Sequence, residues 1–296
     1  MGAEYSEALR DNFPIFQADE YDFYFENMPW PIGLKSTHPT ELKKRVAVAG
    51  ISVVLGARSM DSIYKKYSKI FDYEEPNENR IDLQIQEFVR KKMDLVSDSV
   101  LRSSEREGTK FSAILAEWTL FRTPFSMQLA FYCANRGSLF ESSAVSRSIL
   151  EQVAWASYIL SVDEGVEIPD VSATWCVGNL RKDVPAAGRL YGWMSNHAHW
   201  AFNAHRKAFT VDDGKLGHLF ASCLFKAQSI AVILILIHIL QKVCLKVVSY
   251  DAGNESIQAQ ELLGDDWLPE INRYMNEIKG CEPHSRDLAE VAGILQ

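Results

Sequence analysis

The chain has 296 residues, of which 47% are hydrophobic and 24% are charged, and its formal net charge is −8. These proportions exclude a disordered chain, a collagen and a coiled-coil fibre. The five cysteines stand far apart without a CxxC pair, which argues against a zinc knuckle or a disulfide framework and suits a reducing cytosol. The N-terminus lacks the basic flank and apolar run of a signal peptide. We therefore expect a folded cytoplasmic protein.

The negative charge is concentrated near the N-terminus, where residues 1–30 hold seven acidic residues and one basic residue. Because the remainder is close to neutral, the net charge gives no support for binding nucleic acid or anionic lipid over the whole surface. Three short clusters of basic residues leave a local basic groove as an alternative hypothesis. The simpler explanation is that these clusters lie on the solvated outer faces of helices. These clusters are Lys43, Lys44 and Arg45, then Lys65, Lys66 and Lys69, and then Arg90, Lys91 and Lys92.

The first forty residues mix aromatic side chains with acids and prolines. Proline removes a backbone donor and biases the preceding residue towards extended conformations, so this mixture does not support a long helix. We predict an irregular aromatic arm over residues 1–40 and a single helical domain over residues 41–296. The arm is expected to pack on the body of its own chain or, alternatively, on a protein partner or a second subunit.

From residue 40 onward the apolar residues recur mainly at steps of three and four, which predicts helices almost throughout. A polar loop around Pro76 is expected to separate the first two predicted helices. Asp183 is the expected N-cap of the helix that starts at residue 185. Pro269 is expected to interrupt the predicted helix 255–279. The predicted helices cover residues 40–71, 81–100, 111–135, 138–162, 173–181, 185–209, 216–250 and 255–279.

The segment 227–245 is nearly as apolar as a membrane-spanning helix, which needs about 20 predominantly apolar residues. Its uninterrupted apolar run is only Ile230 to Ile237, followed by His238, and Lys242 lies near its end. A central helix surrounded by other helices is apolar on all sides for the same reason. We therefore predict an all-α, multi-helix bundle around a central helix at about residues 216–250, and no membrane span.

The predicted helix 138–162 carries Arg147 and Glu151 inside an apolar stripe. On a solvent face such a pair contributes only about 0.2–0.5 kcal/mol. On a core-facing stripe an unpaired ion costs several kcal/mol, so the pair is retained either to pack helices or to serve a site. Both explanations stay open. The stripe comprises Phe140, Ala144, Arg147, Glu151, Ala154, Tyr158 and Val162.

A second polar face lies on the helix after Pro185, where three polar side chains occupy successive turns and two glycines permit a neighbouring helix to approach closely. If this face meets the Arg147 face, the polar groups converge on a buried pocket with at least one hydrogen bond across the gap. The glycines are Gly188 and Gly192, and the predicted pocket residues are Arg147, Glu151, Tyr158, Tyr191, Ser195 and His199.

The two motifs, R-x3-E-x6-Y and Y-x3-S-x3-H, resemble those of an uncharacterised bacterial all-helical family catalogued as domain of unknown function 5677. The matching stretches are RSILEQVAWASY and YGWMSNHAH, and the resemblance spans about residues 110–250. It implies no settled activity. More distantly, the family resembles helical nucleotide-binding and ribonuclease domains of prokaryotic toxin and defence systems. Those domains typically carry Arg-x4–6-His on one helix, which this chain lacks, so Arg147 and His199 from separate helices would have to replace it.

Other chemistries have weaker support. His197, His199 and His205 suggest zinc, but a spacing of two on a helix directs ligands to different sides, and no Cys or carboxylate is suitably spaced. The chain has no P-loop, no GxGxxG and no GxSxG, so Ser195 is not supported as a nucleophile. We predict no metal and no cofactor.

Two functions from different classes remain. The first is a helical interaction or sensor protein, associated through the resemblance with prokaryotic stress or defence systems, in which the polar pocket is a structural network or holds a small ligand. The second is a metal-independent, nuclease-like effector acting on a phosphodiester. In it His199 acts as acid or base, Arg147 stabilises the phosphate charge and Glu151 completes the catalytic group.

Overall fold

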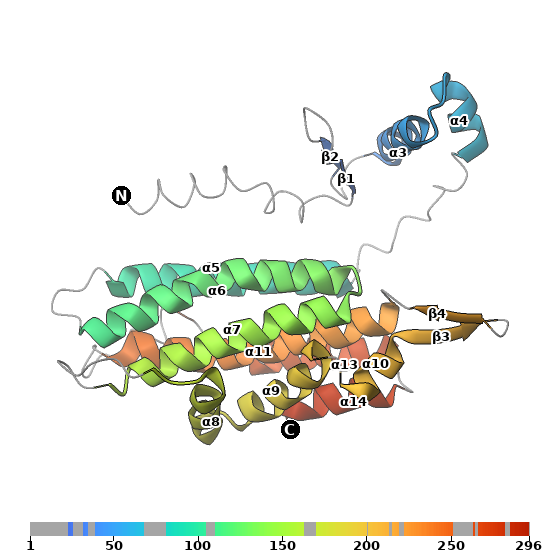
Figure 1. Ribbon diagram of the computed structural model, residues 1–296. Coiled ribbons are helices and arrows are strands. Elements are labelled where there is room, and N and C mark those ends of the chain that lie inside the picture. The colour runs from blue at the N-terminus through green and yellow to red at the C-terminus, as the bar shows by residue number, and fades with distance from the viewer. Residues whose placement is uncertain are drawn as a thin grey trace. The chain divides into compact units, whose positions relative to one another are not determined.

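The structure of the protein, a computed structural model, describes residues 23–25, 32–34, 39–67, 81–104, 110–162, 170–199, 201–212, 215–218, 222–250, 263, 266–281 and 285–295. These residues belong to two compact units, Met1–Arg80 and Ile81–Gln296, which are described separately (Figure 1). The domain boundary expected at residue 40 falls inside the first unit.

The first unit contains one short hairpin and two helices. Strand β1 (Phe23–Phe25) pairs antiparallel with β2 (Ile32–Leu34), so the predicted irregular arm contains regular structure in its described part. The helices are α3 (Thr40–Val54) and α4 (Met60–Tyr67). Where the arm packs is not described by the structure and stays a prediction.

The single helix predicted over residues 40–71 is wrong, because the chain turns after Val54. Gly56 adopts a φ of 59°, a left-handed conformation that commonly ends helices and that glycine adopts without steric cost. The N–H of Ala57 bonds to the carbonyl of Ser52 at 2.8 Å, which closes the end of α3. Residues 68–71 of the predicted helix lie outside the described residues.

The second unit is a bundle of helices, which confirms the predicted all-α class. One further hairpin, of β3 (Phe209–Asp212) and β4 (Lys215–His218), accompanies α10 at one end (Figure 1). The helices are α5 (Ile81–Ser104), α6 (Phe111–Asn135), α7 (Leu139–Ile159), α8 (Ala173–Asp183), α9 (Pro185–Ala198), α10 (Phe202–Lys207), α11 (Cys223–Tyr250), α13 (Leu268–Cys281) and α14 (Arg286–Ala292), followed by the 3-10 turn η2 (Gly293–Leu295).

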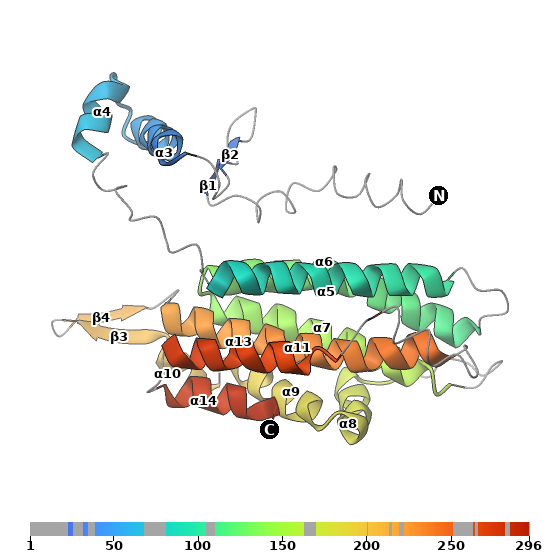
Figure 2. The ribbon, with the colours of Figure 1, turned by 180° about the vertical axis from the view of Figure 1, so that it is seen from behind.

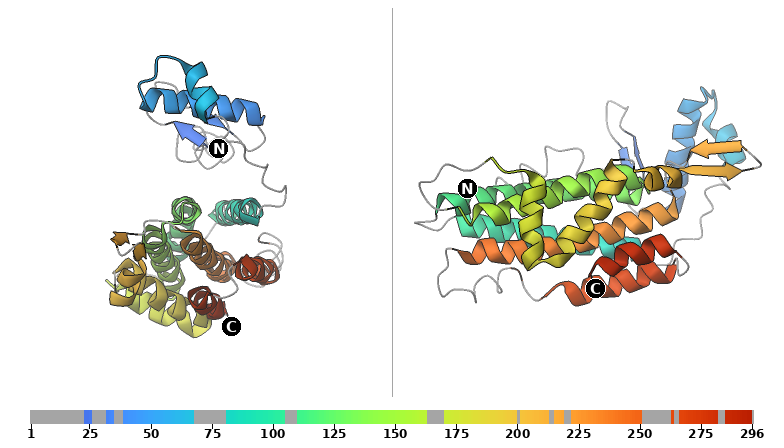
Figure 3. Two further views of the ribbon diagram at one scale, coloured as in Figure 1. Left: turned by 90° about the vertical axis from the view of Figure 1, so that its right-hand side faces the viewer. Right: turned by 60° about the horizontal axis from the view of Figure 1, so that its bottom comes forward.

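Helix α11 is the central helix of this bundle, as predicted. It packs against α5, α6, α7, α9, α13 and α14, and the end-on view shows it enclosed by them (Figure 3). From behind, α13 covers the side of α11 that Figure 1 hides (Figure 2). Every residue from Ile230 to Ile237 is buried. By length and composition Leu224–Tyr250 is apolar enough to cross a membrane, but 78% of its most apolar window is buried in the protein.

The expected start of the central helix at residue 216 is wrong. Lys215 to His218 form strand β4, and α11 begins at Cys223 after Ser222, whose hydroxyl accepts the N–H of Phe225 at 3.0 Å. This is an ordinary N-cap, and the sequence Phe-Thr-Val of β3 consists of residue types with a high strand propensity. The same hairpin ends the helix predicted over residues 185–209, which is divided into α9 and α10.

Helices α6 and α7 form an antiparallel hairpin at the turn around Gly137. This glycine has a φ of 70°, and a Cβ atom there would lie 2.6 Å from the carbonyl oxygen of Ser222. A side chain is therefore excluded by both conformation and space. The turn thus sits directly against the start of α11.

The junction of α8 and α9 differs from the expectation. Asp183 is the last residue of α8, whereas Val184 is the N-cap of α9 and Pro185 is its first residue, which suits the fixed φ of proline. The expected close approach occurs at Gly188, where a Cβ would lie 3.1 Å from the Cβ of Arg181, but not at Gly192, where nothing lies within 4 Å.

The C-terminal part also departs from the predicted helix 255–279. Helix α13 begins at Leu268, so Pro269 lies in its first turn, where proline is tolerated, instead of interrupting it. Residues 255–262 lie outside the described residues. Helix α14 was not expected from the sequence pattern; Ser285 caps it by accepting the N–H of Leu288 at 3.1 Å.

Candidate functional site

Arg147 on α7 is the centre of a polar cluster between α7 and α9. Its Nε donates to Oε1 of Glu151 at 3.0 Å, its Nη2 donates to the hydroxyl of Tyr191 at 3.0 Å, and its Nη1 is hydrogen-bonded to Nε2 of His199. The predicted hydrogen bond between Arg147 and the helix bearing Tyr191 is confirmed. We call Arg147, Glu151, Tyr191 and His199 the Arg147 cluster.

Tyr191 connects the charged pair to its surroundings. Its hydroxyl donates to Oε1 of Glu151 at 3.1 Å and lies 3.3 Å from the hydroxyl of Thr174 on α8. The Cζ atom of Arg147 lies 5.0 Å from the centre of the Tyr191 ring, within the range of a cation–π contact. A single tyrosine therefore binds both members of the ion pair and joins three helices.

The cluster is half-buried, so the prediction of a buried pocket on a core-facing stripe is corrected. The side chains of Arg147 and Glu151 are 22% and 27% exposed, Ala144 of the same stripe is exposed, and so is His199. Phe140 and Ala154 of the stripe are buried, but half of the buried residues of α7 are small, four serines and two alanines, and the serines are not revealed by an apolar periodicity. The stripe consequently lies at the edge of α7, beside α9.

The hydrogen bond to Arg147 orients the His199 imidazole. A guanidinium has only donors, so Nε2 of His199 is the acceptor in this hydrogen bond. His199 lies at the C-cap of α9, with a φ of −96° and a ψ of 10°, and its N–H bonds back to the carbonyl of Ser195. The end of α9 thus presents the imidazole to the guanidinium.

Two of the six predicted pocket residues do not join this network. The hydroxyl of Ser195 is buried and has no hydrogen-bond partner in the described part of the chain. Tyr158 packs edge to face on Trp175, with ring centroids 4.8 Å apart and an interplanar angle of 83°. Ser195 and Tyr158 flank the cluster, and the prediction that they bind within it is not supported by contacts in the structure.

Thr174 is the contact that the sequence analysis missed. It lies on α8, whose place beside α9 depends on the tight α8–α9 junction. No spacing within one helix relates residue 174 to residue 191, so periodicity gives no signal. A prediction of helix packing would have been needed to find it.

Of the histidines considered as zinc ligands, His197 is buried within α9, whereas His199 is exposed at the C-cap of that helix; the side chain of His205 on α10 lies outside the described part of the chain. His197 is buried, stacks on Trp193 with ring centroids 3.9 Å apart, and donates from Nδ1 to the carbonyl of Trp193 at 2.9 Å. Burial lowers the pKa of His197 below its usual range, so the imidazole is neutral at neutral pH. Among the described residues no three side chains of His, Cys, Asp or Glu lie together as metal ligands.

Comparisons with family models, with curated proteins and with solved structures find no match to this chain.

Proposed function

We propose that this chain is a helical interaction or sensor protein in which the Arg147 cluster is a structural network that fixes α9 to α7. The observation that carries the proposal is that all three guanidinium nitrogens of Arg147 are engaged within the chain, by Glu151, Tyr191 and His199. These bonds use three of the five N–H donors of the guanidinium, whereas an arginine poised for bidentate recognition of an anion has more of its donors available.

The charge of Glu151 supports the same proposal. Its carboxylate lies 3.0 Å from Arg147 and neutralises the guanidinium locally. A phosphodiester approaching Arg147 would have to displace or repel this carboxylate at a half-buried position, where charges interact more strongly than in bulk water. The geometry therefore suits holding two helices together better than holding a phosphate.

The test is incubation of the purified chain with structured and single-stranded RNA in the presence of a chelator. We expect no cleavage by the wild-type protein, and the same result for His199→Ala and for Glu151→Gln. Cleavage that requires His199 would contradict the proposal. Cleavage that survives His199→Ala would indicate a contaminating nuclease, because this site would not be responsible.

One observation favours the second candidate, a metal-independent ribonuclease-like effector: the exposed His199 imidazole lies directly against the Arg147 guanidinium. In that mechanism His199 would remove the proton of a ribose 2′-hydroxyl, whose oxygen then attacks phosphorus. The bond to the 5′-oxygen would break, and that oxygen would take a proton from solvent. Arg147 would stabilise the phosphate charge. Products ending in a 2′,3′-cyclic phosphate would establish this candidate.

The cellular setting and partners are part of the proposal and rest on the sequence alone. The resemblance of RSILEQVAWASY and YGWMSNHAH to the helical bacterial family supports a cytoplasmic protein of a stress or defence system. The acidic, aromatic arm of residues 1–40 is the proposed contact with a protein partner or a second copy. Light scattering of the intact chain and of a variant with Phe13, Phe16 and Trp30 changed to serine tests this, since a self-associating arm predicts a smaller mass for the variant.

A further inference from the structure

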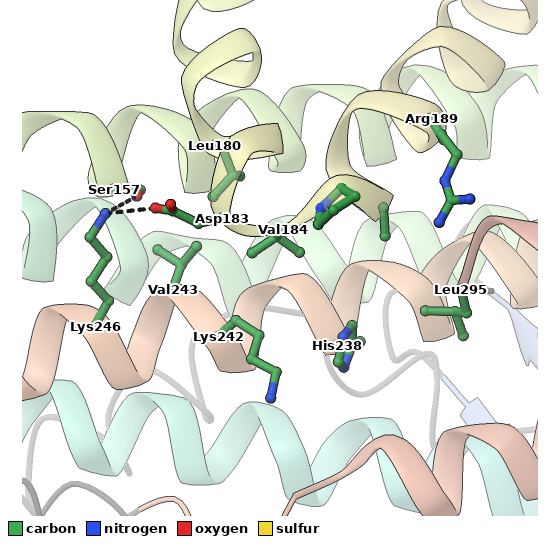
Figure 4. A pocket seen from close by; sticks show the side chains of 12 residues that line it. Ser157, Leu180, Asp183, Val184, Arg189, His238, Lys242, Val243, Lys246 and Leu295 are labelled. Carbon is green, nitrogen blue, oxygen red and sulfur yellow. Dashed lines mark hydrogen bonds and ion pairs between the residues drawn. The ribbon is translucent and has the colours of Figure 1, made fainter.

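A half-open pocket of about 390 Å³, called the cavity below, lies between the α8–α9 junction, α7, α11 and η2 (Figure 4). It contains none of the residues of the Arg147 cluster, so it is a separate feature of the fold. Its size falls in the lower part of the range of small-molecule sites. Half of its lining residues are apolar and come from four elements and the α8–α9 junction: Leu180, Val184, Pro185, Ala186, Val243 and Leu295.

The polar part of the lining is predominantly basic. The lining contains three cations, Arg189, Lys242 and Lys246, and a single carboxylate, Asp183, in a chain whose formal net charge is −8. Lys246 is paired, because its Nζ lies 3.3 Å from Asp183 and 3.2 Å from the hydroxyl of Ser157 (Figure 4). The first turn of α9 forms part of the same wall, and its dipole adds partial positive charge.

Two cations are left to attract a ligand. Arg189 has no hydrogen-bond or ion-pair partner among the residues that the structure describes, although an arginine can donate five hydrogen bonds. Lys242 is held only loosely, with Nζ 4.0 Å from Asp266, which is not part of the lining. Arg189 comes from α9 and Lys242 from α11, so their charges flank the cavity from two helices.

His238, one turn before Lys242 on α11, supplies a directional polar group to the lining. Its Nδ1 is buried and has no hydrogen-bond partner in the described part of the chain. A buried polar atom without a partner costs free energy, so its persistence at a cavity wall indicates that something else can bind it. Burial lowers the pKa of His238, with the nearby Lys242 acting in the same direction, so the ring offers one donor and one acceptor at neutral pH.

From the cavity, its apolar wall and its unpaired cations, we propose that this site binds a small organic anion. The apolar body of the ligand packs on Val184, Val243 and Leu295, and its carboxylate, phosphate or sulfonate group binds at Arg189 within the field of Lys242. The Nδ1 atom of His238 accepts from or donates to a polar group of the body. This site is independent of the proposed role of the Arg147 cluster.

The test uses two probes that differ only in charge. 8-Anilino-1-naphthalenesulfonate is an apolar anion that fluoresces when bound, and N-phenyl-1-naphthylamine is the same ring system without the sulfonate. The full chain is titrated with each probe, followed by the variants Arg189→Gln, Lys242→Gln and, as a matched control for charge, Lys182→Gln on the exposed surface of α8. Circular dichroism and the melting temperature verify that each variant is folded.

We expect the sulfonate probe to bind the wild-type chain and Arg189→Gln to weaken it about tenfold, with a smaller, severalfold loss for Lys242→Gln and no change for Lys182→Gln. The uncharged probe is expected to be insensitive to all three variants. Failure of the sulfonate probe to bind, equal losses for Lys182→Gln and Arg189→Gln, or unchanged binding by Arg189→Gln would each overturn the proposal.

Discussion

The half-buried position of Arg147 determines how much its interactions contribute to the free energy of unfolding. A fully exposed ion pair contributes little, and a fully buried pair carries a large desolvation cost. Arg147 and Glu151 lie between these limits, and Tyr191 adds hydrogen bonds to both of them. The free energy is therefore expected to reside in the hydrogen-bonded group as a whole more than in the ion pair alone.

The first prediction compares two members of this group. Arg147→Ala leaves the Glu151 carboxylate half-buried with only the Tyr191 hydroxyl as a partner, so we expect it to lower the free energy of unfolding by about 1–3 kcal/mol. His199→Ala removes an exposed ring and is expected to cost less than about 1 kcal/mol. Urea unfolding measures both. A His199→Ala variant as unstable as Arg147→Ala would show that the imidazole is a packing residue.

The second prediction concerns the buried imidazole of His197. Its pKa is lowered in the folded protein, so the unfolded chain binds a proton first as the pH falls through about 6.5. The unfolded state then binds more protons than the native state, and stability must decrease with decreasing pH. His238 titrates in the same direction. We expect the melting temperature to fall between pH 7.5 and pH 5.

A variant separates the contribution of His197 from the rest. His197→Asn keeps a donor that can reach the Trp193 carbonyl but does not titrate, so its melting temperature should depend less steeply on pH than that of the wild type. Identical slopes for the two proteins would contradict the assignment.

At the scale of elements, the sequence pattern predicted the long helices and missed the breaks between them. Apolar periodicity identified α6 with the bounds it has in the structure and α7 to within three residues at its C-terminal end, and the run from Ile230 to Ile237 identified α11. The break at Gly56 depends on a single residue, and the hairpin of β3 and β4 depends on a short strand pairing. A hydrophobic periodicity evaluated over the length of a helix detects neither of them.

The same limit applies to the candidate site. Four of its six predicted residues lie together because each helix face follows from spacing alone. The degree of burial was wrong because the buried face of α7 contains Ser142, Ser143, Ser146 and Ser157. These serines are small enough for close helix packing but have no apolar signature. The hydroxyl of Ser142 bonds to the carbonyl of Ala130 on α6 at 3.2 Å, which is visible only in three dimensions.

The third prediction tests the contact between the α6–α7 turn and the start of α11. Gly137→Ala places a Cβ 2.6 Å from the carbonyl of Ser222 at a positive φ, so we expect a loss of about 1–3 kcal/mol in the free energy of unfolding. Gly192→Ala is the control, because nothing lies within 4 Å of its Cβ and alanine favours a helix interior by about 0.5–1 kcal/mol. Equal effects of the two substitutions in thermal melts would contradict this packing.

At the scale of the second unit, α11 is the element on which the bundle depends. Among the helices that the structure describes, six pack against it, and the residues from Ile230 to Ile237 are buried. A helix with this environment separates from its neighbours only when the bundle opens as a whole. The apolar composition that resembles a membrane span is therefore used for contacts inside the chain.

The fourth prediction follows from this burial. In buffer without detergent, the amides from Ile230 to Ile237 should be among the slowest to exchange with deuterium and should report global unfolding. The amides of the exposed ends of α8 should exchange much faster. Rapid exchange within Ile230–Ile237, or a protein that stays in solution only with detergent, would contradict the central position of α11.

The most direct test of the Arg147 cluster is a double-mutant cycle with Arg147→Ala and Tyr191→Phe, measured as free energies of unfolding in urea. Tyr191→Phe removes only the hydroxyl that binds Arg147 and Glu151. If the cluster is one network that fixes α9 to α7, the effects of the two substitutions are not additive, and a coupling free energy of about 0.5–2 kcal/mol is expected. Additive effects, agreeing within about 0.3 kcal/mol, would show that the side chains lie side by side without forming the network and would contradict the proposed role.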